Sequence, residues 1–177
     1  MMTASAQRIT IGQGENAVVA EPDVVISTLL GSCIAVCLHD AIAKIGGMNH
    51  FLLGEPGENQ MVAPADMQRY GVHAMELLIN ALMKAGAKRS RLRAHLYGGA
   101  NIIAGLGAIG SDNARFAERF MATEQIPVDH ADTGGRLARR IDFRPFDGKI
   151  RARAVTEAPA PLAPRPLPPT DGEIFLF

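Results

Sequence analysis

Cys33 and His50 are the two side chains in this sequence best suited to do chemistry together. A thiolate is a strong nucleophile, and a neighbouring imidazole can accept the thiol proton. Both residues lie in a stretch that predicts a β-hairpin, in which Asp40 and Ala43 close a two-residue turn. In that register Cys33 and His50 are directly opposite, with Cβ atoms roughly 5 Å apart. The pair therefore predicts the site of a cysteine hydrolase.

A structural role is the alternative for the same pair. A buried cysteine is more often a small core residue than a nucleophile, and a slip of one residue in the turn moves His50 to the other face. Gly31 and Ser32, directly before Cys33, favour catalysis. Glycine lets the backbone approach a substrate closely, and the amide N–H groups at this corner can hold an oxyanion.

Composition predicts a single soluble domain. The chain has 177 residues, and 47% of them are hydrophobic, which is enough to build a core. With 18 basic and 18 acidic side chains, there is no net charge to attract nucleic acid or an anionic membrane. Two cysteines, no leader pattern and no long apolar run favour a reducing cytoplasm without membrane insertion. Cys33 is therefore expected to be a free thiol.

Metal binding is not expected from the cysteines or histidines. On a strand, Cys33 and Cys37 have Cα atoms about 13 Å apart, too far for a disulfide or a shared metal ion. Cys37 is predicted to be a core residue on the same face as Cys33. The remaining histidines lack metal-binding spacing and are expected to be structural or at the surface: His39, His73, His95 and His130.

The elements that position the pair are expected to be mainly strands. A helix is predicted near 67–85, and a second is expected to begin at a cap formed by Ser111-Asp112-Asn113. Short strands are predicted over 8–12, 17–20, 24–30, 91–96, 126–130, 137–143 and 149–155, with clear alternation of apolar residues over 91–96. The fold class is therefore α/β, without the regular βαβ alternation of a parallel sheet.

Two further segments have distinctive patterns. Residues 105–110 match the glycine spacing of dinucleotide-binding loops, but no strand leads directly into them, so we interpret them as a glycine loop before a helix. Six of the eleven prolines lie within 158–170, which predicts an extended tail. The expected organisation is a flexible N-terminus over 1–7, a folded domain over 8–157 and a Pro-rich tail over 158–177.

Several ordered motifs resemble the CheD family of chemoreceptor glutamine deamidases, over roughly residues 8 to 155. The resemblance implies a single-domain layered α/β sandwich with mixed, mainly antiparallel sheets, similar to deamidating bacterial toxins. The motifs are Thr28-Leu29-Leu30-Gly31-Ser32-Cys33, Gly46-Gly47-Met48-Asn49-His50-Phe51-Leu52-Leu53, Arg69-Tyr70-Gly71, Met75-Glu76-Leu77-Leu78-Ile79-Asn80, Tyr97-Gly98-Gly99-Ala100, Asn113 with Phe116, Asp132-Thr133-Gly134-Gly135 and Phe143-Arg144-Pro145.

The resemblance implies a catalytic cysteine, histidine and hydroxyl residue. Cys33 matches the nucleophile and His50 the base. Counting back from the corner places the hydroxyl on Ser27, with Thr28 as the adjacent alternative. Neighbours on a strand point to opposite faces, so only one of them can orient His50, and Ser27 is preferred. Backbone groups at Gly31 and Ser32 are expected to hold the oxyanion.

The implied activity is deamidation of glutamines on the cytoplasmic helical bundle of methyl-accepting chemoreceptors. It passes through a cysteine thioester, needs no metal or organic cofactor and serves adaptation in bacterial chemotaxis. Some members of the family bind a CheC-type phosphatase. A non-catalytic regulatory binding protein of the chemotaxis system is therefore the main alternative, and a thiol amidase or peptidase with a different substrate is a third possibility. No nucleic-acid partner is expected.

Overall fold

The computed structural model describes residues 5–53, 64–102 and 108–156. In these ranges the elements, in chain order, are β1 (Gln7–Thr10), β2 (Asn16–Val19), β3 (Val24–Leu30), β4 (Ile34–Asp40), β5 (Ile45–Asn49), α1 (Pro64–Lys84), a 3₁₀ turn (Arg89–Arg91), β6 (Arg93–Gly98), α2 (Ile109–Thr123), β7 (Val128–Thr133), β8 (Ala138–Arg144) and β9 (Lys149–Val155).

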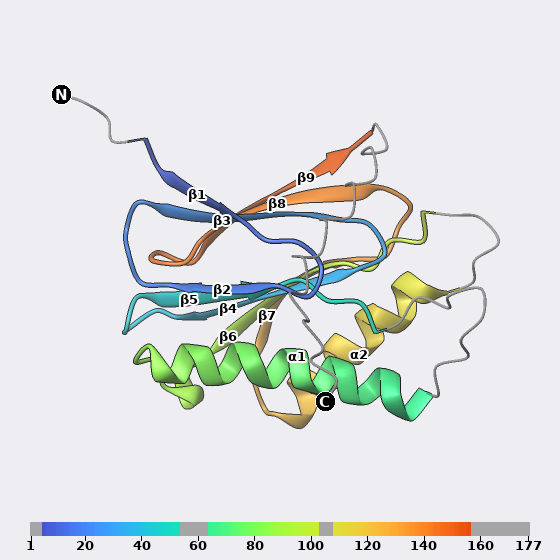
Figure 1. The fold of residues 1–177 in the computed structure, drawn as a ribbon, viewed down its shortest axis with the longest axis horizontal. Helices are drawn as coiled ribbons and strands as arrows, with labels where there is room; N and C mark the ends of the chain where they lie inside the picture. Colours follow the sequence, from blue (N-terminus) through green and yellow to red (C-terminus); the bar gives the residue numbers. More distant parts are fainter. Residues whose placement is uncertain (1–4, 54–63, 103–107, 157–177) are drawn as a thin grey trace, which may run out of the picture.

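These elements form three layers (Figure 1). Sheet A has the order β1-β3-β8-β9, and sheet B has the order β2-β5-β4-β6-β7. Both α-helices cover the face of sheet B that points away from sheet A. Strands β1 and β3 pair in parallel, as do β6 and β7, while the remaining pairs are antiparallel. The predicted α/β sandwich with mixed, mainly antiparallel sheets is confirmed.

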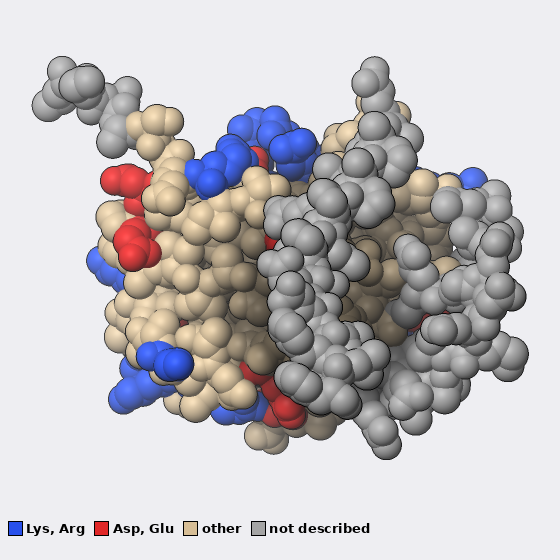
Figure 2. Space-filling view, in the orientation of Figure 1, with Lys and Arg blue, Asp and Glu red and all other residues tan. Residues whose placement is uncertain are grey.

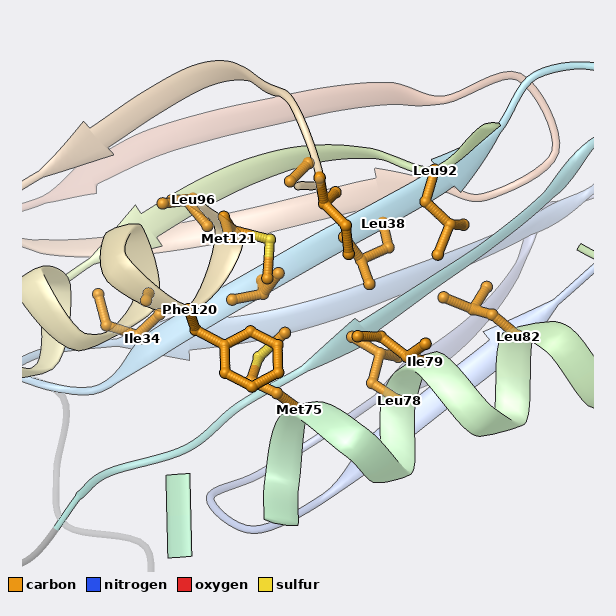
Figure 3. Close-up of a cluster of buried hydrophobic side chains, with 14 of the residues drawn as sticks. Ile34, Leu38, Met75, Leu78, Ile79, Leu82, Leu92, Leu96, Phe120 and Met121 are labelled. Carbon is orange, nitrogen blue, oxygen red and sulfur yellow. The ribbon is translucent and has the colours of Figure 1, made fainter. Parts of the chain in front are cut away.

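Sheet B lies between two hydrophobic cores, which explains why nearly every residue of β4 is buried. Ile34, Val36 and Leu38 face the helices, where they pack with residues such as Leu78 of α1 (Figure 3). Ala35 and Cys37 alternate with them and face sheet A. The prediction that Cys37 is a core residue is confirmed: it is 1% exposed, and burial strongly raises the pKa of its thiol.

The hairpin between β4 and β5 has a different register from the one predicted. Its turn contains four residues, 41–44, and Lys44 adopts a left-handed conformation (φ 55°). The Asp40 carboxylate accepts hydrogen bonds from the N–H groups of Ile42 and Ala43, which shapes this longer turn.

The new register places Cys37 opposite Met48 and Ile34 opposite Phe51. Continuing it brings His50 level with Ala35, two positions along from Cys33. The direct opposition of Cys33 and His50 is therefore wrong. A shift of two residues leaves side-chain direction along a strand unchanged, and the Cys33 side chain packs against the core between the two sheets.

The start of α2 also differs from the prediction. The helix begins at Ile109 after an N-cap at Ala108, without a side-chain cap, so Ser111 lies inside the helix. The glycine run over 105–110 lies partly outside the described residues. Its last glycine, Gly110, packs so closely on the carbonyls of Gly99 and Ala100 that a Cβ there would clash with them. The Pro-rich tail and most of the predicted N-terminal segment lie outside the described residues, and Gln7 belongs to β1.

The described surface carries charges of both signs. Lys and Arg gather in several small groups separated by uncharged surface on the face seen in Figure 2, and Asp and Glu appear among them. This mixture agrees with a net charge of zero. Within the described residues, the helices are all too short or too polar to cross a membrane.

Candidate active site

The corner Gly31–Cys33 carries the chain from β3 in sheet A to β4 in sheet B, on the right in Figure 1. Each of its three carbonyls accepts a hydrogen bond. Gly31 O accepts from Ala100 N (3.0 Å), Ser32 O from Asn113 Nδ2 (2.8 Å) and Cys33 O from Gly99 N (2.8 Å). The nucleophile candidate therefore sits on a corner whose backbone is fixed by the segment after β6 and by α2.

Gly98 is required for this fixation. Its φ of 108° is one that side chains rarely adopt, and a Cβ at this position would collide with the carbonyl oxygen of Cys33. Asn113, which is 1% exposed, adds a second connection. Its Oδ1 accepts from Leu53 N (3.1 Å), so one side chain ties the corner to the segment that follows His50.

The backbone of His50 is bound to the turn between β1 and β2. Gly14 N donates to His50 O (2.7 Å), and His50 N donates to Glu15 O (3.0 Å). The ring is buried, with the residue only 7% exposed. On the side of α1, His50 borders a pocket of about 220 Å³ that is also lined by Tyr70 and His73.

The His50 ring contacts Thr28. Thr28 Oγ1 lies 2.7 Å from His50 Nδ1 and donates its single hydrogen to the carbonyl of Ile11 (2.8 Å). The hydroxyl therefore has only a lone pair to offer the ring, so Nδ1 must carry the proton and donate it. In this tautomer Nε2 has a free electron pair and can act as a base.

Ser27 does not take part in this contact, which corrects the preference for Ser27 over Thr28. Its hydroxyl lies on the other face of β3, where it donates to the carboxylate of Asp142, the residue opposite it on β8, and accepts from Arg8. Burial of Asp142 favours a higher pKa, but hydrogen bonds from Ser27 and Arg8 outweigh it and hold the pKa of this carboxyl below its usual value. Ser27 thus belongs to a polar cluster on sheet A.

Electrostatics keep His50 neutral. Burial disfavours the imidazolium, while the negative charge of Glu15 favours it, and the balance lowers the pKa of His50 to about 4. At neutral pH the ring is therefore uncharged. Cys33 is half-buried and Cys37 is buried.

The sequence did not single out the turn over residues 12–15, although one of its side chains contacts the thiol. Gln13 Oε1 lies 3.9 Å from Cys33 Sγ. A glycine on each side of Gln13 was the available signal, since it predicts a tight turn, but it does not indicate where that turn packs. Among the described residues, no group of three or more His, Cys, Asp or Glu side chains is placed to hold a metal ion.

Comparison with known proteins gives a family model and several relatives that agree with one another. The family model described as CheD chemotactic sensory transduction matches residues 52–154. A probable chemoreceptor glutamine deamidase CheD from Zymomonas mobilis is 56% identical over 149 residues, covering 84% of this chain and 81% of its own. Proteins with the same name from Agrobacterium fabrum and Caulobacter vibrioides are 49% and 46% identical, covering 100% and 97% of this chain and 100% and 94% of their own.

Among solved structures, the hypothetical protein YfiH from Bacillus licheniformis is similar with a TM-score of 0.42 and 10% identity. That match covers 66% of this chain and 49% of the other.

Proposed function

This chain belongs to the CheD family, and we propose from that membership and from the site geometry that it converts glutamines of chemoreceptors to glutamate. The match to the Agrobacterium protein spans 100% of both chains. The observation that carries the chemical part of the proposal is the Thr28–His50 hydrogen bond, because it leaves Nε2 of His50 as a base on the same face as Cys33.

In the first half-reaction, Cys33 Sγ attacks the carbon of a glutamine carboxamide while His50 Nε2 takes the thiol proton. A C–S bond forms and the carbonyl oxygen becomes an oxyanion. When this intermediate collapses, the C=O bond re-forms and the C–N bond breaks. The leaving nitrogen takes the proton from His50 and departs as ammonia.

In the second half-reaction, water attacks the resulting thioester and gives a proton to His50. The C–S bond breaks, the thiol recovers its proton and the receptor carries glutamate. Thr28 holds the ring in the productive tautomer throughout and supports the imidazolium that forms in each half. This assigns Thr28, and not Ser27, as the positioning hydroxyl.

The backbone of the corner suits the oxyanion. A planar trans peptide points the N–H of one residue opposite to the carbonyl of the residue before it. Since the carbonyls of Gly31 and Ser32 are bound to Ala100 and Asn113, the N–H groups of Ser32 and Cys33 face the other way, out of that contact. They are the proposed backbone donors to the oxyanion.

The proposed substrate surface is the helical bundle of a methyl-accepting receptor. Ile102, which is 45% exposed, packs over Gly31 beside the nucleophile and offers an apolar contact to such a helix. The new carboxylate changes the repulsion between neighbouring receptor helices and provides a site for methylation. We place the protein in the cytoplasm, with a CheC-type phosphatase as a second partner.

The test is peptide mapping by mass spectrometry of a purified receptor cytoplasmic fragment incubated with the wild-type protein or the Cys33→Ser variant. Glutamine-to-glutamate conversion by the wild type alone is expected, with an unchanged circular dichroism spectrum for the variant. Equal conversion by a folded Cys33→Ser variant would overturn the assignment of the nucleophile. No conversion of any native receptor by folded wild-type protein would favour a regulatory binding protein instead.

A further inference from the structure

The turn between β1 and β2 is built to present the side chain of Gln13. Glu15 N donates to Gly12 O (3.1 Å), which closes a four-residue turn with Gln13 and Gly14 at its centre. Gly14 has a φ of 83°, as the third residue of a type II turn requires. The Glu15 carboxylate accepts from Gly12 N (2.7 Å) and closes the turn a second time. Gln13 is therefore exposed on a doubly closed turn.

This turn and the residue before it contact all three residues of the proposed site. Ile11 O accepts the hydroxyl hydrogen of Thr28 (2.8 Å). Gly14 and Glu15 form the two backbone hydrogen bonds to His50. Gln13 brings its carboxamide to 3.9 Å from Cys33 Sγ. The backbone that places Gln13 is thus the same backbone that places the base and its orienting hydroxyl.

We propose that Gln13 is a catalytic residue whose side-chain amide donates a hydrogen bond to the oxyanion. This inference rests on the proposed deamidase function and extends it. In the resting site the carboxamide oxygen faces the thiol and accepts its hydrogen. When the thiol proton moves to His50 and an oxyanion forms on the carbon bonded to Sγ, the oxyanion attracts the NH₂ group of the Gln13 carboxamide and repels its oxygen. A half-turn of the terminal amide, a soft torsion, brings the nitrogen there.

The distance suits this role. A donor close to Sγ lies within reach of an oxygen attached to the carbon that Sγ attacks, and oxyanion donors work at 2.7–3.1 Å from that oxygen. Ser32 and Cys33 offer backbone N–H groups from the corner between β3 and β4, while Gln13 offers its side-chain amide from the turn between β1 and β2. The oxyanion is then held from two separate segments of the chain.

Gln13 is itself a glutamine beside the nucleophile, so a self-inhibitory substrate mimic is the competing role. The two roles predict opposite effects. Removing an oxyanion donor slows turnover, whereas removing a mimic that occupies the site speeds turnover or lowers KM. A donor also contributes nothing to alkylation of the thiol, because displacement of iodide by a thiolate forms no oxyanion.

The experiment compares the wild type, Gln13→Ala and Gln13→Glu in steady-state deamidation of a receptor cytoplasmic fragment. The matched control is Gln7→Ala, at an exposed glutamine on β1. Iodoacetamide alkylation of Cys33 and thermal unfolding are measured on the same proteins. We expect kcat to fall roughly 100- to 1,000-fold in Gln13→Ala with KM within about twofold, given the usual effect of one oxyanion donor. Gln13→Glu falls further, since its carboxylate repels the oxyanion.

In Gln13→Ala the alkylation rate should not fall below the wild-type rate, because the lost carboxamide oxygen binds the protonated thiol and not the thiolate. The unfolding midpoint of Gln13→Ala should match the wild type, and Gln7→Ala should match it throughout. Unchanged or raised kcat in Gln13→Ala would overturn the proposal, and so would a parallel loss of alkylation, which would indicate an effect on the thiol instead. An inactive wild type in the same assay would overturn the deamidase function and the role of Gln13 together. An active wild type with an equally active Gln13→Ala variant would overturn the role of Gln13 alone.

Discussion

Replacing Thr28 with valine tests the central hydrogen bond of the site. Valine keeps the shape of threonine but has no hydroxyl, so two buried groups, His50 Nδ1–H and the carbonyl of Ile11, lose their partner. Each buried unpaired group costs roughly 1–3 kcal/mol, so we expect the free energy of unfolding to fall by about 2–6 kcal/mol.

The same substitution should lower kcat by about 100-fold, within the range attributed to a well-placed general base, because His50 is free to adopt the tautomer with its proton on Nε2. KM should change little, since Thr28 is 3% exposed and does not reach the substrate. Thr28→Ser restores the hydroxyl and should recover most of the activity.

Ser27→Ala is the matched control. It removes a hydroxyl from the other face of β3, where its loss weakens the contact with Asp142 by about 1 kcal/mol. Its kcat should stay near the wild-type value. Deamidation kinetics and urea unfolding of the three variants measure both effects. A strong loss of kcat in Ser27→Ala, with Thr28→Val near wild type, would refute the assignment.

Three further predictions follow from the same contacts. Burial lowers the pKa of His50 to about 4, while an unfolded histidine titrates near 6.5. As the pH falls, the unfolded chain therefore takes up a proton first, and the stability that is present above pH 6.5 is lost. The unfolding free energy should fall by about 2 kcal/mol more in the wild type than in His50→Gln between pH 7 and pH 5, and equal falls in urea titrations would contradict the burial argument. Gly98→Ala should displace the carbonyl of Cys33 and reduce both deamidation and the unfolding midpoint, whereas Gly134→Ala, where a Cβ meets no neighbour, should show only the cost of its left-handed backbone. Asp40→Asn should lower the unfolding free energy by about 3 kcal/mol, because the fully buried carboxylate pairs with Arg91 (2.8 Å), and kcat should be retained since this pair lies at the far end of β4 from Cys33.

Local patterns predicted most of the elements. The bounds of β3 and β9 agree with the sequence prediction because turn residues adjoin them: Pro22-Asp23 and Gly31-Ser32 enclose β3, and Asp147-Gly148 precedes β9. The predicted shared face of Cys33 and His50 does not depend on the predicted turn length, since a register error of two residues leaves side-chain direction unchanged. The error itself came from the turn: Lys44 is left-handed without being glycine, and the Asp40 side chain stabilises a turn longer than two residues.

The remaining features depend on contacts between distant segments. Choosing between Ser27 and Thr28 required knowing that β3 and β4 belong to different sheets, because residue parity cannot be counted through the corner at Gly31–Cys33. Gln13 reaches the thiol only because β1 pairs in parallel with β3, a pairing that no local pattern encodes.

Diverting the acyl intermediate tests the proposed chemistry most directly. Hydroxylamine attacks a thioester to give a hydroxamate and release the thiol, so a receptor fragment incubated with this protein and hydroxylamine should carry hydroxamate and glutamate at the same mapped positions. The Cys33→Ser variant should give neither product. Glutamate formation by the wild type without any hydroxamate, together with glutamate formation by a folded Cys33→Ser variant, would contradict a cysteine thioester mechanism.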